Sequence, residues 1–154
     1  MTQSTDAIEV SSDPARLDRD LVHAFLCRES YWAPGIARET VERAIDGSIP
    51  FGLYENGAQV GFARAVTDGV TFAWIADVFV VGSHRRRGLG RLLVEAVLDH
   101  PEIRGARNVL LATADAHGLY SRYGFAPLAQ PDRYLNLRQP GREPFGPAAG
   151  RPEA

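Results

Sequence analysis

The sequence predicts a single domain of the α/β class, more closely the α+β type, in which helices pack on a sheet. Three observations support this prediction. The 154 residues suit one domain with one core. Apolar residues recur at helical spacing in the segment 88–100, and turn pairs such as Asn56-Gly57 separate extended runs. With 45% hydrophobic and 23% charged residues, the composition is that of a folded globular protein.

The N-terminal part of the domain is expected to be helical. Asp13 and Pro14 form an N-cap followed by a proline at the first helical position, and apolar residues then fall on one face, which predicts a helix over 14–28. A polar and aromatic break over 29–35 precedes a second short helix, which Gly47 ends as its C-cap.

The middle of the chain changes to the period of strands. Runs 51–54 and 59–67 flank the Asn56-Gly57 pair and predict a tight hairpin. Asp68-Gly69 forms a second turn, and the β-branched and aromatic run 71–81 is typical of a well-buried central strand.

The clearest helix of the sequence spans 88–100, because its leucines, alanine and valine recur at intervals of three and four residues. A short buried strand over 109–112 and a short helix over 115–123 follow it. The order of elements predicts that the long helix packs on a sheet by one face.

The end of the domain is predicted as a strand pair, 125–128 with 134–137. Four prolines and three glycines then follow in 139–154 with little to bury, so this segment is expected to be a disordered tail. The domain therefore spans residues 1–138.

Charge and cysteine content exclude several classes of function. The net charge of −2 and the acidic pI argue against a nucleic-acid partner, because only Arg85–Arg87 form a dense basic cluster. A single cysteine, Cys27, rules out an intrachain disulfide and a four-thiolate metal site, and we expect no metal. No run approaches the length of a membrane span, and Met1–Ser12 lacks the features of a signal peptide, so we expect a cytoplasmic protein without a membrane partner.

The segment 84–91 has the features of an anion site, because it joins the end of a buried strand to the start of a helix. A helix start offers unpaired N–H groups and the positive end of the helix dipole, and Gly88 and Gly90 allow a ligand to approach the backbone. The alternative is structural, since glycines tighten many turns and arginines commonly cover surfaces. The spacing matches neither the P-loop nor the dinucleotide-binding pattern.

Two motifs resemble those of the GNAT superfamily of N-acetyltransferases. Arg85-x-x-Gly88-x-Gly90 follows the buried run 77–81, and Ala116 precedes a second motif, Leu119-Tyr120-Ser121-Arg122-Tyr123-Gly124-Phe125. The resemblance covers roughly 17–137. It implies a three-layer fold whose central sheet is mixed, mostly antiparallel, has six to seven strands, splays between the fourth and fifth, and carries about four helices.

The resemblance also implies acetyl-CoA as co-substrate. Backbone N–H groups of 86–91 would hold the pyrophosphate, and the strand 78–80 would run along the pantetheine arm. Thr113 stands where many members have an asparagine that contacts the cofactor. The cofactor-binding residues predicted in this way are Val78, Phe79, Val80, Arg85, Arg86, Arg87, Gly88, Leu89, Gly90, Arg91 and Thr113.

Acyl transfer from a thioester to an amine needs a proton donor, carbonyl polarisation and a neutral amine. The resemblance places Tyr120 as the donor, although it also suits simple packing. A backbone N–H near 78–80 would polarise the carbonyl if a bulge leaves it unpaired. Asp77 and His117 are candidate bases, with a paired structural aspartate and a helix-surface histidine as alternatives, and a water relay would replace both.

By analogy with the superfamily, the acceptor pocket would draw on four aromatic residues, Tyr31, Trp32, Phe51 and Tyr134, which would equally suit the core. The predicted function is acetyl transfer from acetyl-CoA to a primary amine of a small molecule or peptide, by direct attack in a ternary complex. The alternative is a non-catalytic acyl-CoA-binding regulatory module on the same fold. Superfamily members often form homodimers.

Overall fold

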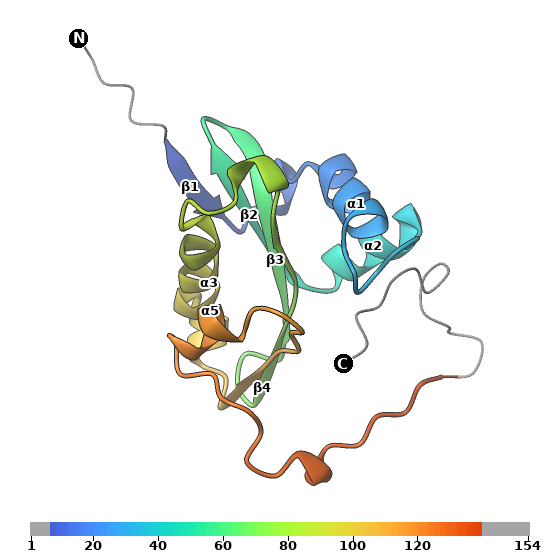
Figure 1. The fold of residues 1–154 in the computed structure, drawn as a ribbon, viewed down its shortest axis with the longest axis vertical. Coiled ribbons are helices and arrows are strands. Elements are labelled where there is room, and N and C mark those ends of the chain that lie inside the picture. The colour runs from blue at the N-terminus through green and yellow to red at the C-terminus, as the bar shows by residue number, and fades with distance from the viewer. Residues whose placement is uncertain (1–6, 140–154) are drawn as a thin grey trace.

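The computed structural model describes residues 7–139, which contain one sheet of five strands in the order β1-β2-β3-β4-β5 (Figure 1). Neighbouring strands pair antiparallel except β4 and β5, which are parallel. The expected α+β class and the mixed, mostly antiparallel sheet are therefore confirmed. The strands are β1 (Ile8–Ser11), β2 (Ile49–Glu55), β3 (Ala58–Thr67), β4 (Phe72–Val80) and β5 (Asn108–Leu110).

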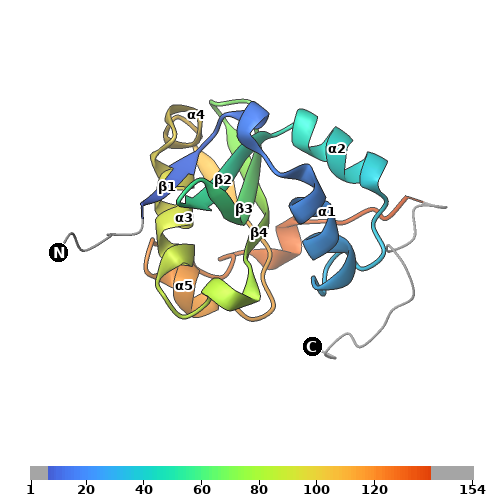
Figure 2. The ribbon, with the colours of Figure 1, turned by 90° about the horizontal axis from the view of Figure 1, so that it is seen from above.

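Helices cover both faces of this sheet. Figure 2 shows α1 and α2 on one side and α3 and α5 on the other. Short 3₁₀ turns occupy Pro14–Arg16, Gly82–His84 and Pro131–Arg133. The helices are α1 (Arg19–Arg28), α2 (Arg38–Asp46), α3 (Leu89–Asp99), α4 (Pro101–Arg104) and α5 (His117–Ser121).

The core consists of two clusters, one for each face of the sheet. On the α3 side, Leu89, Leu93 and Val97 are at most 5% exposed and pack against inward-facing residues of β2, β3 and β4. On the α1 and α2 side, the ring of Phe25 stacks on that of Phe79, with 3.9 Å between centroids. Strand β4 contributes to both clusters, because an irregularity between residues 76 and 79 reverses the face that its alternate side chains point to.

A β-bulge interrupts the pairing of β3 with β4. Residues 62 and 64 of β3 pair with 79 and 76 of β4, so β4 carries one more residue than β3 between these pairs. Asp77 lies in the bulge with φ of 54°, a left-handed conformation that few residues other than glycine adopt. A bulge is therefore present in β4, as required if a backbone N–H near 78–80 is to polarise the carbonyl of a thioester.

The N-terminal segment departs from its prediction in two ways. The helix expected over 14–28 begins as a 3₁₀ turn, and α1 starts only at Arg19. The reason is Asp18, whose carboxylate accepts a hydrogen bond from the N–H of Leu21 and whose own N–H donates to Gln59 Oε1. Strand β1, which the sequence did not predict, pairs antiparallel with β2.

The prediction of a final strand pair is wrong. Neither 125–128 nor 134–137 forms a strand, and the sheet has five strands within residues 7–139 rather than six or seven. All residues from 126 to 139 are exposed. The tail predicted over 139–154 lies, apart from its first residue, outside the described residues.

Candidate active site

Strands β4 and β5 separate soon after they meet. Their pairing covers only Phe72–Trp74 with Asn108–Leu110. Beyond these pairs, a cavity of about 590 Å³ lies between residues 74–78 of β4 and the segment 111–116 that follows β5. The described structure thus has a pocket where two parallel strands diverge, at the position that the sequence predicts for chemistry.

Two aromatic residues from the connection between α1 and α2 line this pocket. The Tyr31 hydroxyl accepts a hydrogen bond from the N–H of Ala114, 2.9 Å away, and Trp32 Nε1 donates to Asp77 Oδ1 at 2.8 Å. The two rings meet edge to face with 5.0 Å between centroids. Each ring is therefore held by its polar atom, one against each side of the gap between the strands.

The other two aromatic residues predicted for the acceptor pocket do not line it. Phe51 is 2% exposed, belongs to the core under α3 and contacts the ring of His100 edge to face, so the core alternative holds for this residue. Tyr134 is half-exposed on the segment after α5. Sequence reasoning missed Trp74 of β4, which does line the pocket.

Tyr120 reaches the pocket from α5 and is only 7% exposed. Burial raises the pKa of its phenol to about 12, with smaller contributions from Tyr31 and Asp115. The hydroxyl therefore stays protonated at neutral pH. His117, the first residue of the same helix, is exposed and is not among the residues that line the pocket.

Both carboxylate oxygens of Asp77 are engaged. Oδ2 accepts from Arg64 Nε at 2.6 Å, and Oδ1 accepts from Trp32. Arg64 also donates to Ser48 Oγ at 3.0 Å. With side chains 13% and 20% exposed, Asp77 and Arg64 form a well-shielded ion pair beside the bulge, which favours the paired structural alternative for this aspartate.

The turn before α3 has the backbone shape expected of an anion site. Arg86 and Gly88 both have positive φ, 64° and 73°, and Gly88 is the N-cap of α3 without a side-chain cap. A Cβ at Gly88 would meet nothing within 4 Å, so space is open in front of the helix start. Alternating left-handed residues turn successive N–H groups into one concavity, which binds anions.

Two of the three clustered arginines have partners within the protein. Arg85 Nε donates to the carbonyl of Val80 at 3.1 Å. Arg87 binds both oxygens of Glu55, at 2.8 and 3.0 Å, and His84 Nε2 lies 2.7 Å from the same carboxylate. The sequence analysis did not single out Glu55. Its position directly before the Asn56-Gly57 turn could have indicated it, because this turn lies at the end of the sheet where β4 ends.

We expect the bonds to Glu55 to make the protein sensitive to acid. The Arg87 guanidinium lowers the pKa of Glu55 from its ordinary 4.5 to about 2, against the effect of burial. Because the pKa of Glu55 is lower in the folded than in the unfolded state, its ionised form stabilises the fold above pH 4.5. This stabilisation is lost as the pH falls towards 2. Glu55→Gln should therefore lower the free energy of urea unfolding most at neutral pH and least near pH 2.

The matched control for this prediction is Glu39→Gln, which neutralises an exposed carboxylate on α2. Urea unfolding at a series of pH values compares both variants with wild type. A difference between wild type and Glu55→Gln that stays constant from pH 7 to about pH 2.5 would contradict the role of this carboxylate.

Three further predicted cofactor residues occupy three different kinds of position. Val78 lines the pocket, whereas the side chain of Phe79 is buried against Phe25, so only the backbone of Phe79 is available to a ligand. Thr113 Oγ1 accepts hydrogen bonds from the N–H groups of Asp115 and Ala116 at 3.4 and 3.0 Å. Its hydroxyl therefore fixes the turn into α5.

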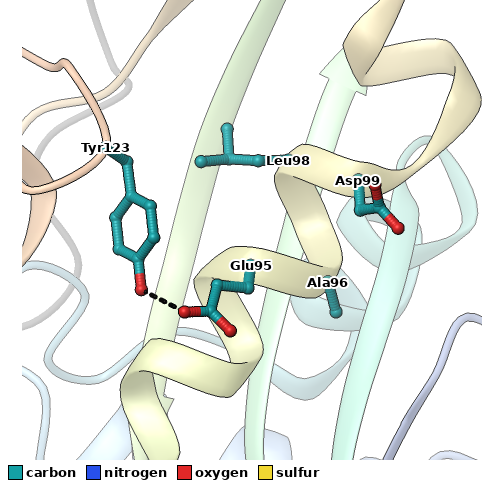
Figure 3. Close-up of a pocket in the computed structure, with 5 residues that line it drawn as sticks. All are labelled: Glu95, Ala96, Leu98, Asp99 and Tyr123. Carbon is teal, nitrogen blue, oxygen red and sulfur yellow. Dashed lines mark hydrogen bonds between the residues drawn. The ribbon is translucent and has the colours of Figure 1, made fainter.

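A shallow pocket on the outer side of α3 contains no predicted site residue (Figure 3). Its main contact is the hydroxyl of Tyr123, which donates to Glu95 Oε1 at 2.8 Å. This bond joins the segment after α5 to α3. It therefore helps to hold the helix that carries Tyr120.

Within residues 7–139, no cluster of three metal-ligating side chains occurs. In the same part of the chain, every helix is too short or too polar to cross a bilayer.

The fold and the site define the class of protein. A pocket where parallel strands diverge, a turn at the adjoining helix with the backbone shape of an anion site and a buried tyrosine are the features expected of an acetyltransferase. The chain belongs to the acetyltransferase (GNAT) family, whose sequence profile matches residues 20–125. Enzymes of this family use acetyl-CoA.

Similar proteins agree with this assignment. A candidate acetyltransferase of Gibberella zeae is 33% identical in an alignment of length 136 that covers 73% of this chain and 75% of that protein. The chloroplastic serotonin N-acetyltransferase 2 of Oryza sativa subsp. japonica is 34% identical over 99 residues, which cover 60% of this chain and 50% of the rice protein.

Solved structures show the same fold. A candidate GNAT acetyltransferase from Xanthomonas campestris has 45% identity and a TM-score of 0.83, over 88% of this chain and 95% of that one. A Clostridium acetobutylicum acetyltransferase solved with acetyl-CoA has 15% identity and a TM-score of 0.65, over 86% of this chain and 96% of that one, which supports the fold alone.

Proposed function

We propose that the protein transfers the acetyl group of acetyl-CoA to a primary amine of a small molecule or peptide, by direct attack in a ternary complex. The observation that carries this proposal is the pocket between β4 and β5, which brings the protonated Tyr120 and the bulge at Asp77 to one cavity. The Clostridium structure with acetyl-CoA lends further support, since its fold is shared.

The backbone of this chain would bind two parts of acetyl-CoA, the pyrophosphate and the pantetheine arm. The open turn at Gly88 and the first N–H groups of α3 suit the pyrophosphate, because both present donors without an intrahelical acceptor. The β4 backbone from 78 to 80 suits the amides of the pantetheine arm as an added strand. Glu55 would fix the turn by its bonds to Arg87 and His84.

The chemical step would use two groups of the pocket. As the amine nitrogen bonds to the thioester carbon, the carbonyl oxygen becomes negative, and an N–H freed by the bulge near Val78 would stabilise it. The carbon–sulfur bond then breaks. Tyr120 would donate a hydrogen bond or proton to the departing thiolate, because its raised pKa keeps it neutral.

We assign Asp77 a positioning role rather than that of the base. Its two oxygens already accept bonds from Arg64 and Trp32, so it holds both the bulge and the aromatic wall in place. His117 is exposed outside the pocket. The proton of the attacking amine would therefore leave through water.

The rings of Tyr31, Trp32 and Trp74 favour an acceptor with an apolar or aromatic body beside its amine, because burial of such a body excludes water from the pocket. The similarity to the rice serotonin N-acetyltransferase supports the same class. An arylalkylamine is therefore the first acceptor to test.

The test is a continuous assay of free thiol with acetyl-CoA and three amines: tyramine, spermidine and a lysine-containing peptide. Cys27 contributes at most one thiol per chain, so turnover is counted only beyond that stoichiometry. We expect amine-dependent thiol release, fastest with tyramine. If acetyl-CoA raises the melting temperature but none of the three amines, nor a wider amine library, releases thiol, the non-catalytic acyl-CoA-binding module is the better account.

A further inference from the structure

Asp115 lies just before α5 and lines the pocket of the candidate active site. An aspartate at such a position often caps the helix, because its carboxylate accepts hydrogen bonds from the first N–H groups. Here Ala116 is the N-cap of α5, without a side-chain hydrogen bond to the helix. The N–H of Asp115 bonds to Thr113 Oγ1 at 3.4 Å, so the turn is held without the carboxylate. Capping therefore does not account for the charge of this residue.

The carboxylate of Asp115 is not neutralised within the described part of the chain. Among the described residues that line the pocket, only Asp77 and Asp115 carry a charge. Asp77 forms an ion pair with Arg64 and accepts a further hydrogen bond from Trp32. The exposed side chain of Asp115 makes no hydrogen bond or ion pair with any residue of 7–139. The wall of the pocket is therefore negative at this one residue.

The charge of Asp115 acts on the end of the pocket where Tyr120 lies. Burial is the main cause of the raised pKa of Tyr120, and Tyr31 and Asp115 raise it further. The Tyr31 hydroxyl bonds to the N–H of Ala114, directly beside Asp115. An acceptor between these groups would replace water that screens the carboxylate, so a charge on the acceptor would interact with Asp115 more strongly than across bulk solvent.

We propose that Asp115 is a specificity-determining residue, which makes the pocket select amines that carry no carboxylate beside the amino group. The ammonium form of an amine is attracted to Asp115, whereas a free amino acid also brings a second negative charge to it. The acceptors would therefore be arylalkylamines and uncharged derivatives of amino acids. The consequence for turnover rests on the proposed function, whereas binding of the amine is measured separately.

The test compares two ligands, phenylalaninamide and phenylalanine, which share the ring and the amino group and differ in the charge of the carboxyl group. Asp115→Asn removes the charge of the pocket wall and nearly keeps the shape of the side chain. Glu39→Gln is the control, because it neutralises an exposed carboxylate on α2 that does not line the pocket. Lost attraction for the ammonium affects both ligands alike, so the ratio of their dissociation constants isolates the repulsion.

Tryptophan fluorescence measures binding without turnover, in the presence of CoA, which has no acetyl group to transfer. Both tryptophans of the chain, Trp32 and Trp74, line the pocket, and neither ligand absorbs where tryptophan alone is excited. We expect wild type and Glu39→Gln to bind phenylalaninamide more tightly than phenylalanine. Asp115→Asn should reduce this preference by about 3- to 10-fold. With acetyl-CoA, the ratio of the two kcat/KM values should change in the same way.

A merely structural role of Asp115 would change the melting temperature and both affinities together, but not their ratio. An unchanged ratio in Asp115→Asn would overturn the proposal, and so would an equal change in Glu39→Gln. Wild type that binds neither ligand also refutes the selection, whereas the thiol assay with other amines still decides the proposed function. If the binding ratio changes as expected but no amine releases thiol, the proposed function fails and the selection by charge stands.

Discussion

Replacing Tyr120 by phenylalanine lowers kcat for the amine by about two to four orders of magnitude, the usual contribution of a general acid. The substitution removes one hydroxyl from a buried side chain and leaves the ring in its contact with Phe125. Binding of acetyl-CoA should therefore persist, and kcat should fall far more than KM changes. Steady-state kinetics with acetyl-CoA and the preferred amine measure the effect.

The pKa of Tyr120 sets the expected size of this loss. A phenol with a pKa of about 12 is a weaker acid than a thiol, whose ordinary pKa is about 8.5. Complete transfer of its proton to the thiolate is therefore uphill, and the main contribution is a hydrogen bond that stabilises the departing sulfur. For this reason we expect the effect nearer 100-fold than 10,000-fold.

The matched control is Tyr123→Phe. It removes a hydroxyl three residues further along the chain, from a tyrosine that bonds to Glu95 on the outer side of α3 (Figure 3). We expect kcat close to that of wild type, with a small loss of stability. A Tyr120→Phe enzyme with the kcat of wild type, or equal losses in both variants, would remove Tyr120 from the chemistry.

Replacing Gly88 by glutamate should abolish the thermal stabilisation that acetyl-CoA gives. At about 100 times its dissociation constant, a ligand adds roughly 2.7 kcal/mol to the native state, or roughly 5 to 10 °C for a domain of this size. A carboxylate at Gly88 would project into the open space before α3, against the phosphates. A loss of affinity of about 100-fold leaves only about 0.4 kcal/mol of the stabilisation.

Gly88→Ala is the control for backbone strain. With φ of 73°, any side chain at this position costs about 1 to 3 kcal/mol, so both variants melt earlier than wild type without ligand. Alanine adds no charge and little bulk, so its shift with acetyl-CoA should stay near that of wild type. An undiminished shift in Gly88→Glu would refute the placement of the pyrophosphate at this turn.

The sequence predicts the elements that position the site better than it predicts the rest. The predicted helix over 88–100 and α3 differ by one residue at each end, and the hairpin at Asn56-Gly57 is confirmed. Both are local features: a periodic apolar face and a turn pair determine them without help from distant residues.

Features that depend on distant contacts escaped prediction. Strand β1 has four residues and owes its conformation to pairing with β2. Glu55 meets Arg87 across 32 positions of sequence, and nothing local marks either as a partner. The segment 134–137 has the pattern of a strand, but pattern alone does not say whether a neighbouring strand is within reach.

The hydrogen bond from Ala114 to the Tyr31 hydroxyl joins the α1–α2 connection to the far side of the pocket. One tyrosine side chain thus ties the α1–α2 connection to the segment that follows β5, across the pocket. If the proposed acceptor enters beside this ring, an amine too bulky for the gap reaches the pocket only when the bond breaks, at a net cost of about 1 kcal/mol. On the proposed function, the length of a phenol would therefore limit the range of acceptors.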